Sequence, residues 1–232
     1  NPLHAAEPVG HMSPSPYLPV SRRFVNPIYV RPEEIVETAY LTGPQRSLID
    51  WGGEEQRASS LRNDYIDRDE VWETKRQALE IIFKVPRSFA RQAAYEKYLE
   101  EEGQGLTDFA LWCALCEKYP KGFPENIATA DSVYVAREKR ALTDRIEFWS
   151  WLQWVADEQL EKAQEAALAS GMHIGVCADL AVGVHPIGAD VWANPTAFAR
   201  GVTVGAPADM YNQQGQDWSQ PPWNPHKLAE AS

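Results

Sequence analysis

The pattern of hydrophobic and polar positions predicts helices over the middle of the chain. Within residues 67–85, apolar side chains recur at helical spacing between charged ones, at Val71, Ala78, Ile81 and Ile82. Residues 88–102 and 107–119 are further helix candidates. Gly103–Gly105 separate these two candidates, and Thr107 is a suitable N-cap for the second of them.

Thr143–Ser170 gives the strongest helical pattern in the chain, and an apolar run follows it. One face of this helix carries Phe148, Leu152, Val155, Ala163 and Ala166. Gly171 can adopt the left-handed backbone conformation that ends a helix. The run Ile174–Leu180 predicts a buried parallel strand, because such strands are apolar on both faces. This strand delivers Asp179 to its C-terminal end, where α/β barrels build their active sites.

Proline shapes the N-terminal segment. Pro14, Pro16 and Pro19 remove backbone donors and fix φ, which makes a regular helix implausible over residues 1–31. We interpret this segment as a shaped loop that ends in a short apolar run, Pro27–Val30.

A helix, a glycine stop and a buried strand together form the αβ unit of an α/β fold. Only one such unit is clear, whereas a closed (β/α)8 barrel needs roughly 250 residues with strands along its whole length. We therefore predict an α/β fragment of a (β/α)8 TIM barrel that carries a mostly helical inserted subdomain. Residues 1–45 form a barrel-rim loop and the start of the insertion, and residues 46–142 form the helical insertion. Residues 143–232 form the barrel helix, the unit around the strand Ile174–Leu180 and a long loop near the C-terminus.

Composition narrows the class of protein. Of 232 residues 44% are hydrophobic, so a folded core is expected, and the net charge of −11 argues against nucleic acid as a partner. Three cysteines are an odd, small number that fits a reducing compartment.

No apolar run reaches the roughly 18 residues of a membrane span, and no signal peptide opens the chain. We expect a soluble, cytoplasmic protein without a membrane partner. Because the first residue is Asn1, we expect the chain to be part of something longer.

A polar and aromatic loop near the C-terminus is the strongest sign of chemistry. Residues 209–218 combine Asp209 with aromatic and amide side chains. Carboxylates and amides chelate sugar hydroxyls, and aromatic rings stack on sugar C–H faces. The chain has nine Trp and nine Tyr, more than a core of this size needs. This loop therefore favours a carbohydrate site.

Other candidates have structural alternatives that the residues alone leave open. Tyr17 in its proline-fixed loop suits stacking on a sugar, because little entropy is lost on binding, but it can equally be a surface tyrosine. Asp179 can bind a ligand, cap a helix or form a buried ion pair. Asp190 can cap a one-turn helix, and Trp192 can pack against the barrel rim.

Cofactor and metal sites are not expected. Cys113 and Cys116 form a C-x-x-C inside a helical pattern, without the strand-to-helix turn of a redox motif or the second pair of a zinc site. The five histidines show no ligand spacing, and glycine-rich phosphate motifs are absent. We interpret both cysteines as helix packing, and likewise Trp149, Trp151 and Trp154.

Four segments make the chain similar to the 4-α-glucanotransferases (amylomaltase or disproportionating enzyme) of glycoside hydrolase family 77. They are Ser15-Pro16-Tyr17 through Asn26-Pro27, Trp151-Leu152-Gln153-Trp154-Val155 to Gln159-Leu160, Ala178-Asp179-Leu180, and Ala189-Asp190-Val191-Trp192-Ala193. The tail Gly205-Ala206-Pro207-Ala208-Asp209 through Gly215-Gln216-Asp217-Trp218 extends the resemblance.

The resemblance implies roles for particular residues. Tyr17 matches the family's loop tyrosine near the sugar at subsite −1, and Asp179 matches the aspartate after the third barrel strand, which hydrogen-bonds the same sugar. The resemblance thus makes residues 143–232 the barrel helix, the third-strand unit and a long substrate loop. The loop from Asp209 through Gln216 matches the flexible loop over the acceptor subsites, and Trp218 lines that side of the cleft. The predicted substrate-binding residues are Tyr17, Asp179, Asp190, Trp192, Asp209, Tyr211, Gln216 and Trp218.

The family's catalytic acids do not match any residue of this chain. The family works by retaining double displacement, with an aspartate nucleophile in an Arg-x-Asp-His motif on the next barrel strand. The chain lacks this motif and ends at Ser232, where that strand is due. We therefore expect no catalytic residue within the chain, and no activity from it alone. The implied partner is a maltodextrin or other α-1,4-glucan. The alternatives are a non-catalytic α-glucan-binding module and an α-glucan hydrolase of the related barrel clan.

Overall fold

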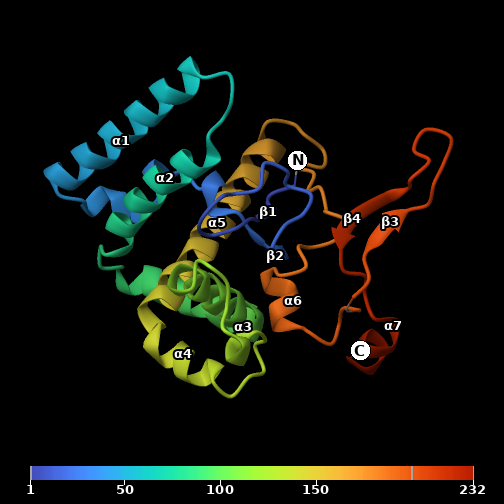
Figure 1. Ribbon diagram of the computed structural model, residues 1–232. Helices are drawn as coiled ribbons and strands as arrows, with labels where there is room; N and C mark the ends of the chain where they lie inside the picture. Colours follow the sequence, from blue (N-terminus) through green and yellow to red (C-terminus); the bar gives the residue numbers. More distant parts are fainter. Residues whose placement is uncertain (1, 200, 232) are drawn as a thin grey trace.

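Helices dominate the structure, a computed structural model that describes residues 2–199 and 201–231 (Figure 1). The helices are α1 (Gly43–Arg62), α2 (Arg68–Phe83), α3 (Phe89–Lys118), α4 (Val135–Ala141), α5 (Thr143–Ala169), α6 (Ala189–Ala193) and α7 (Pro225–Ala231). The strands are β1 (His4–Ala5), β2 (Ser21–Val25), β3 (Val204–Ala206) and β4 (Gln216–Gln220). They pair antiparallel as β1–β2 and β3–β4. Within the described ranges, no helix is both long and apolar enough to cross a membrane.

The predicted helix over residues 67–85 is confirmed as α2. Asp67 is its N-cap, with a side-chain oxygen that accepts from the backbone N of Glu70 at 3.0 Å. This bond satisfies one of the backbone donors that the first helical turn leaves unpaired. The helix then buries Trp72, Leu79 and Ile82 against the rest of the molecule.

We expect Asp67→Ala to lower the free energy of unfolding by about 1 kcal/mol, the usual cost of a lost N-cap. Urea denaturation would measure the change. Asp64→Ala is the matched control, because Asp64 is an exposed aspartate in the turn before the cap. Equal stability of the two variants would show that the cap contributes nothing.

The two helices predicted over residues 88–119 form one element, α3, which bends at Gly103. Gly103 has φ 58° and ψ −141°, a conformation that favours glycine, so the predicted break is correct in position. The predicted N-cap is wrong. Ser88 caps the helix, while the Thr107 hydroxyl donates back to the carbonyl of Gly103 at 3.4 Å. The helix resumes directly after the kink, which leaves Thr107 inside it.

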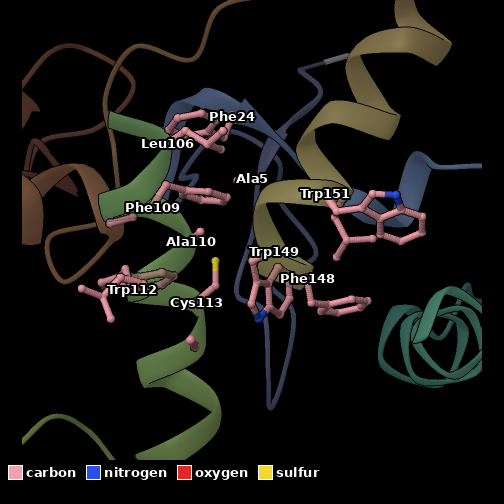
Figure 2. Packing of buried hydrophobic residues seen from close by; sticks show 14 of the residues in the cluster. Ala5, Phe24, Leu106, Phe109, Ala110, Trp112, Cys113, Phe148, Trp149 and Trp151 are labelled. Atoms are coloured by element: carbon pink, nitrogen blue, oxygen red, sulfur yellow. The ribbon is translucent and has the colours of Figure 1, made fainter. Parts of the chain in front are cut away.

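The core lies where α5 crosses α3 (Figure 2). Nine consecutive residues of α5, 148–156, are buried. Trp149, Trp151 and Trp154 lie among them, which confirms that these tryptophans pack. Cys113 packs into the same cluster, as predicted. Its Sγ is buried, and burial raises the pKa of this thiol well above its usual range.

The buried residues of α5 all lie in the first half of the helix. Ala163 and Ala166, which the helical pattern also placed on the apolar face, are exposed. Gly171 ends the helix with φ 96°, as predicted.

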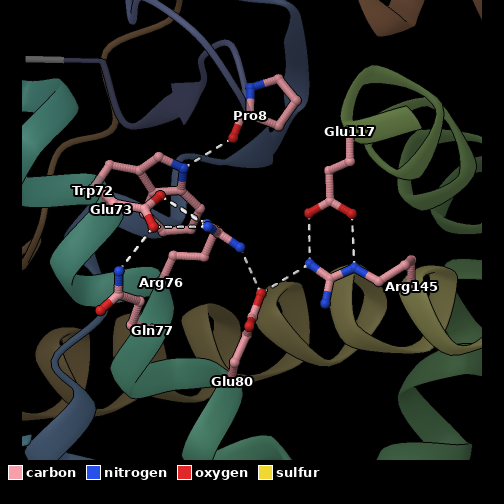
Figure 3. A network of polar contacts seen from close by, with 8 residues as sticks. All are labelled: Pro8, Trp72, Glu73, Arg76, Gln77, Glu80, Glu117 and Arg145. Carbon is pink, nitrogen blue, oxygen red and sulfur yellow. Dashed lines mark hydrogen bonds and ion pairs between the residues drawn. The ribbon is translucent and has the colours of Figure 1, made fainter. Parts of the chain in front are cut away.

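A network of ion pairs joins α2, α3 and α5 (Figure 3). Arg76 contacts Glu80 at 2.7 Å within α2, and Glu80 contacts Arg145 of α5 at 3.2 Å. Arg145 also donates through Nε to Glu117 of α3 at 2.7 Å. Because Arg145 of α5 pairs with a carboxylate of α2 and with another of α3, the network links the three helices.

The predicted buried strand Ile174–Leu180 is wrong for the structure described. The segment lies in neither sheet, and its apolar side chains are largely exposed, with Ile174 at 81%. Gln164 of α5 instead accepts from the backbone N of Val176 at 2.7 Å and donates to the carbonyl of Ile174 at 3.0 Å. A strand requires a neighbouring strand to pair with, and no described residue supplies one beside this segment.

Two segments interpreted as loops contain paired strands. β1 and β2 lie within the N-terminal segment, where Ala5 pairs with Ser21 and the proline-rich residues form the connection between them. The apolar run Pro27–Val30 begins as a 3₁₀ turn, Pro27–Tyr29. β3 and β4 turn the polar loop near the C-terminus into a hairpin that projects from the helices (Figure 1). These strands are two to five residues long, too short for a clear alternating pattern.

Candidate functional site

The structure brings together two predicted site residues from opposite ends of the chain. The hydroxyl of Tyr17 donates to Oδ2 of Asp179 at 3.0 Å, across 162 residues of sequence. This hydrogen bond, followed by the charge of the same carboxylate, raises the pKa of the Tyr17 phenol above its usual value. Tyr17 is half exposed, so a ligand can reach both the ring and the carboxylate.

Tyr17 is carried by a loop that is anchored on α2. Trp72 donates through Nε1 to the carbonyl of Pro8 at 2.9 Å, as Figure 3 shows. The backbone N of Met12 donates to Oδ1 of Asp69 at 2.7 Å, and the Met12 side chain is buried. Only Ser13–Pro16 then separate this anchor from Tyr17, and two of those four residues are prolines. The loop therefore holds Tyr17 with little conformational freedom.

A hydrogen bond between His11 and Asp69, whose strength depends on pH, anchors the same loop. Nδ1 of His11 lies 2.7 Å from Oδ2 of Asp69, and this hydrogen bond raises the pKa of His11 above its usual 6.5. A raised pKa in the folded state gives stability that is complete below the unfolded pKa and disappears as pH rises through the folded value.

We expect wild-type protein to exceed His11→Gln in stability by most at pH values below 6.5, and the difference to disappear as pH rises above 6.5 through the raised pKa of His11. Thermal unfolding midpoints of both proteins across this range would measure it. A difference that does not change with pH would show that His11 contributes through shape rather than charge.

Asp190 is fixed by the N-terminal strands. Its Oδ2 accepts from the backbone N of Arg22 at 2.9 Å, and its own N donates to the carbonyl of Val20 at 3.2 Å. The two segments approach so closely that a Cβ on Gly188 would lie 2.6 Å from the Val20 oxygen. Asp190 therefore holds together the parts of the chain that carry Tyr17 and Asp179, and its predicted role in binding substrate stays a prediction.

Trp192 of α6 is buried where α6 packs against α3. It donates through Nε1 to the carbonyl of Ile127 at 3.0 Å and meets Phe123 edge-on, with ring centroids 6.3 Å apart. Trp192 therefore packs, as one alternative expected, but against residues of the range 46–142, which is the predicted insertion, and not against a barrel rim. At 4% exposure its ring offers no open face to a sugar in this structure, which argues against direct stacking. Its predicted role in binding substrate stays a prediction.

A cavity of about 890 Å³ lies beside Trp192. Its lining is mostly apolar and includes Trp112, Phe123 and Ile187. Tyr17 and Asp179 are not among its lining residues, so this cavity is separate from the site that those two residues mark.

The remaining predicted residues lie on the β3–β4 hairpin. Asp209 organises the turn, because its Oδ1 accepts from the backbone N of Tyr211 at 2.8 Å and of Asn212 at 2.7 Å. The bond from Asn212, followed by that from Tyr211, lowers the pKa of Asp209. The Tyr211 ring is 89% exposed at the tip. Trp218 donates through Nε1 to Gln216 at 2.9 Å. The hairpin thus presents an ordered polar and aromatic surface on a projecting arm.

Two residues that contact the Asp179 segment were missed in the sequence. His4 and Arg22 both bond to the backbone of Ala181, two residues after Asp179. His4 is one of five histidines that show no ligand spacing. Arg22 lies within the segment Ser15–Pro27 that carries the family resemblance, but the resemblance gives it no role. The contacts of His4 and Arg22 with Ala181 span more than 150 residues of sequence, so the local pattern does not indicate them.

Comparisons with known proteins place the chain in a family. The sequence profile of the 4-alpha-glucanotransferases, glycoside hydrolase family 77, matches residues 1–232. The chain belongs to this family. The 4-alpha-glucanotransferase of Mycobacterium tuberculosis is 49% identical over 241 residues, covering 99% of the chain and 33% of that protein. The 4-alpha-glucanotransferase of Haemophilus influenzae is 30% identical over 250 residues, covering 98% of the chain and 35% of that protein.

Solved structures agree with the sequence comparison. The amylomaltase of Corynebacterium glutamicum superposes with a TM-score of 0.88 at 46% identity, over 100% of the chain and 31% of that structure. The amylomaltase of Streptococcus agalactiae, solved in complex with acarbose, gives a TM-score of 0.75 at 19% identity, over 99% of the chain and 46% of that structure. This second likeness concerns the fold alone. The chain spans about a third of the length of the curated relatives named above.

Proposed function

We propose that this chain is the substrate-binding part of a 4-α-glucanotransferase that moves α-1,4-glucan segments between maltodextrins by a retaining double displacement. The observation that carries the proposal is the Tyr17–Asp179 hydrogen bond. It joins the two residues that the family resemblance assigns to one sugar, in a chain that belongs to that family. The catalytic acids belong to parts of the protein outside these 232 residues.

The pair has the chemistry that a sugar requires. The Asp179 carboxylate accepts hydrogen bonds from sugar hydroxyls, and hydrogen bonds to a charged acceptor are stronger than those between neutral groups. The Tyr17 hydroxyl occupies one acceptor position now, and an incoming sugar hydroxyl competes with it for the carboxylate. The half-exposed tyrosine ring supplies an apolar face to the sugar C–H groups.

In this proposal the β3–β4 hairpin supplies the acceptor subsites, which bind the glucan that receives the transferred segment. Tyr211, Gln216 and Trp218 combine exposed rings with an amide on one arm, and the arm projects from the body where a long glucan can lie along it (Figure 1). The Asp209 turn keeps the tip ordered through its two backbone bonds. Maltodextrin or a related α-1,4-glucan is the partner that this surface fits.

The proposed setting is a (β/α)8 barrel completed by the rest of the protein. In that setting, residues 174–180 pair with neighbouring barrel strands, and residues 46–142 form a helical insertion between barrel elements. The apolar character of Ile174 and Leu180, which are exposed in this chain, supports the proposal because barrel strands are covered on both faces.

Maltotriose is the substrate that tests the function. The protein, extended to the length of its relatives, is incubated with maltotriose and the products are separated by chromatography. Glucose together with longer maltodextrins is the expected result. Glucose and maltose without longer products would identify a hydrolase. Unchanged maltotriose with a folded protein would identify a non-catalytic glucan-binding relative. The 232-residue chain alone is expected to leave maltotriose unchanged.

A further inference from the structure

Ala181 is held on both sides of its peptide backbone by side chains of the N-terminal strands. Its N–H donates to Nε2 of His4 at 3.1 Å. Its carbonyl accepts from Nη1 of Arg22 at 3.0 Å, and the same nitrogen donates to the carbonyl of Val182 at 3.2 Å. Ala181 is buried, at 1% exposure. The two side chains thus offer an acceptor and a donor, as a neighbouring strand does.

The strands that carry this clamp are themselves fixed. His4 lies on β1 and Arg22 on β2, and the two strands pair. The backbone of Arg22 is bound by Asp190, and the Arg22 guanidinium lies over the Trp223 ring at 5.5 Å from its centroid. An arginine fixed at both its backbone and its guanidinium loses little further freedom when it binds the Ala181 segment.

Asp179 lies between two points of attachment. On one side Gln164 binds the backbone of Ile174 and Val176, and on the other side His4 and Arg22 bind that of Ala181. The segment between these points is exposed and lies in neither sheet. The backbone that carries Asp179 is therefore positioned by side chains on both sides, and the nearer of these two backbone attachments is the one at Ala181. The carboxylate itself also accepts a hydrogen bond from Tyr17 at 3.0 Å.

We propose that His4 and Arg22 are positioning residues, which fix Asp179 for the glucan by clamping Ala181. This inference rests on the proposed function, because it takes Asp179 to be the residue that binds the sugar. It adds two residues that act through the backbone and do not touch the substrate.

The clamp requires neutral His4, because only an unprotonated Nε2 accepts from the Ala181 N–H. Burial lowers the pKa of His4, and the nearby Arg22 lowers it further, while Asp190 and Asp179 act in the opposite direction. A depressed pKa means that the bond is complete above the usual value of 6.5 and is lost as pH falls through the folded pKa. Acid should therefore release Ala181.

The test uses the protein extended to the length of its relatives, with His4→Gln, His4→Leu and Arg22→Met. Glutamine keeps an acceptor near the position of Nε2 but does not titrate, whereas leucine removes the acceptor. His173→Gln is the control, an exposed histidine in the turn after α5. Two quantities are measured. One is amide hydrogen exchange in the peptide that contains Ala181, and the other is kcat/KM on maltotriose as a function of pH.

We expect His4→Leu and Arg22→Met to speed exchange at Ala181 and to lower kcat/KM, each by about tenfold, because a buried partner is left unpaired. His4→Gln should have the wild-type kcat/KM near neutral pH. At acid pH its kcat/KM should fall less than that of wild type, because glutamine does not become protonated. The control should match wild type in both measurements.

Either measurement can overturn the inference. Unchanged exchange in His4→Leu would show that the clamp does not form. Faster exchange with unchanged kcat/KM would show that the clamp does not position Asp179 for the sugar. An unaltered acid limb in His4→Gln would exclude His4 as its cause. If wild type transfers no glucan, the proposed function fails, and the positioning role fails with it, while exchange still decides whether the clamp exists.

Discussion

Replacement of Asp179 by alanine is expected to lower kcat/KM on maltotriose by about two orders of magnitude in the protein extended to the length of its relatives. A hydrogen bond to a charged group contributes up to about 3 kcal/mol, and about 1.4 kcal/mol corresponds to each factor of ten in rate. Asp179 is at the surface and its segment lies in neither sheet, so its removal leaves the core intact. The measurement is the initial rate of glucose release, with the thermal unfolding midpoint as the test of folding.

Tyr17→Phe is the matched variant for this prediction. It keeps the ring and removes only the hydroxyl that donates to Asp179 at 3.0 Å. We expect a loss of about tenfold or less, because a neutral hydrogen-bond partner contributes about 0.5–1.5 kcal/mol and the ring still stacks on the sugar. If Asp179→Ala kept normal activity in a folded protein, Asp179 would have only a structural role. If Tyr17→Phe lost more activity than Asp179→Ala, the assignment of the main role to the carboxylate would be wrong.

Replacement of Arg91 by methionine is expected to destabilise the protein by about 3–5 kcal/mol, the cost of removing one partner from a buried ion pair. Arg91 of α3 contacts Glu37 through Nε at 2.9 Å and Glu158 of α5 through Nη2 at 2.9 Å. Its guanidinium lies 4.0 Å from the centroid of the Trp154 ring. The Glu37 side chain is only 3% exposed, so removal of Arg91 leaves a buried carboxyl group without its ion-pair partner. Urea denaturation would measure the loss.

Arg31→Met is the control for this second prediction. Arg31 also pairs with two glutamates, Glu33 and Glu34, but its side chain is 64% exposed. Exposed ion pairs contribute about 0–1 kcal/mol, so the control should change stability little. Adding Glu37→Gln to Arg91→Met should recover part of the lost stability, because the stranded charge is then removed. Equal effects of Arg91→Met and Arg31→Met would show that burial does not matter here.

The helices and the core were predictable because their causes are local. The helices α2 and α5 follow from the spacing of apolar residues and from their caps or stops, Asp67 and Gly171. The packing of Trp149 and Cys113 follows from their positions within helical patterns. The strand predicted over residues 174–180 failed because a strand depends on a partner elsewhere in the protein, which its own residues do not encode.

The sequence by itself determined which residues were candidates for the site, since Tyr17, Asp179 and the polar aromatic loop can be recognised from their types and their neighbours in the chain. Only the tertiary structure decided how these candidates are grouped. It joined Tyr17 to Asp179, gave Asp190 backbone partners, buried Trp192, and put Trp218 on a projecting hairpin. It also revealed the clamp of His4 and Arg22 on Ala181. The physical reason is sequence distance, because contacts across more than 150 residues depend on how the intervening chain packs and not on the residues next to them.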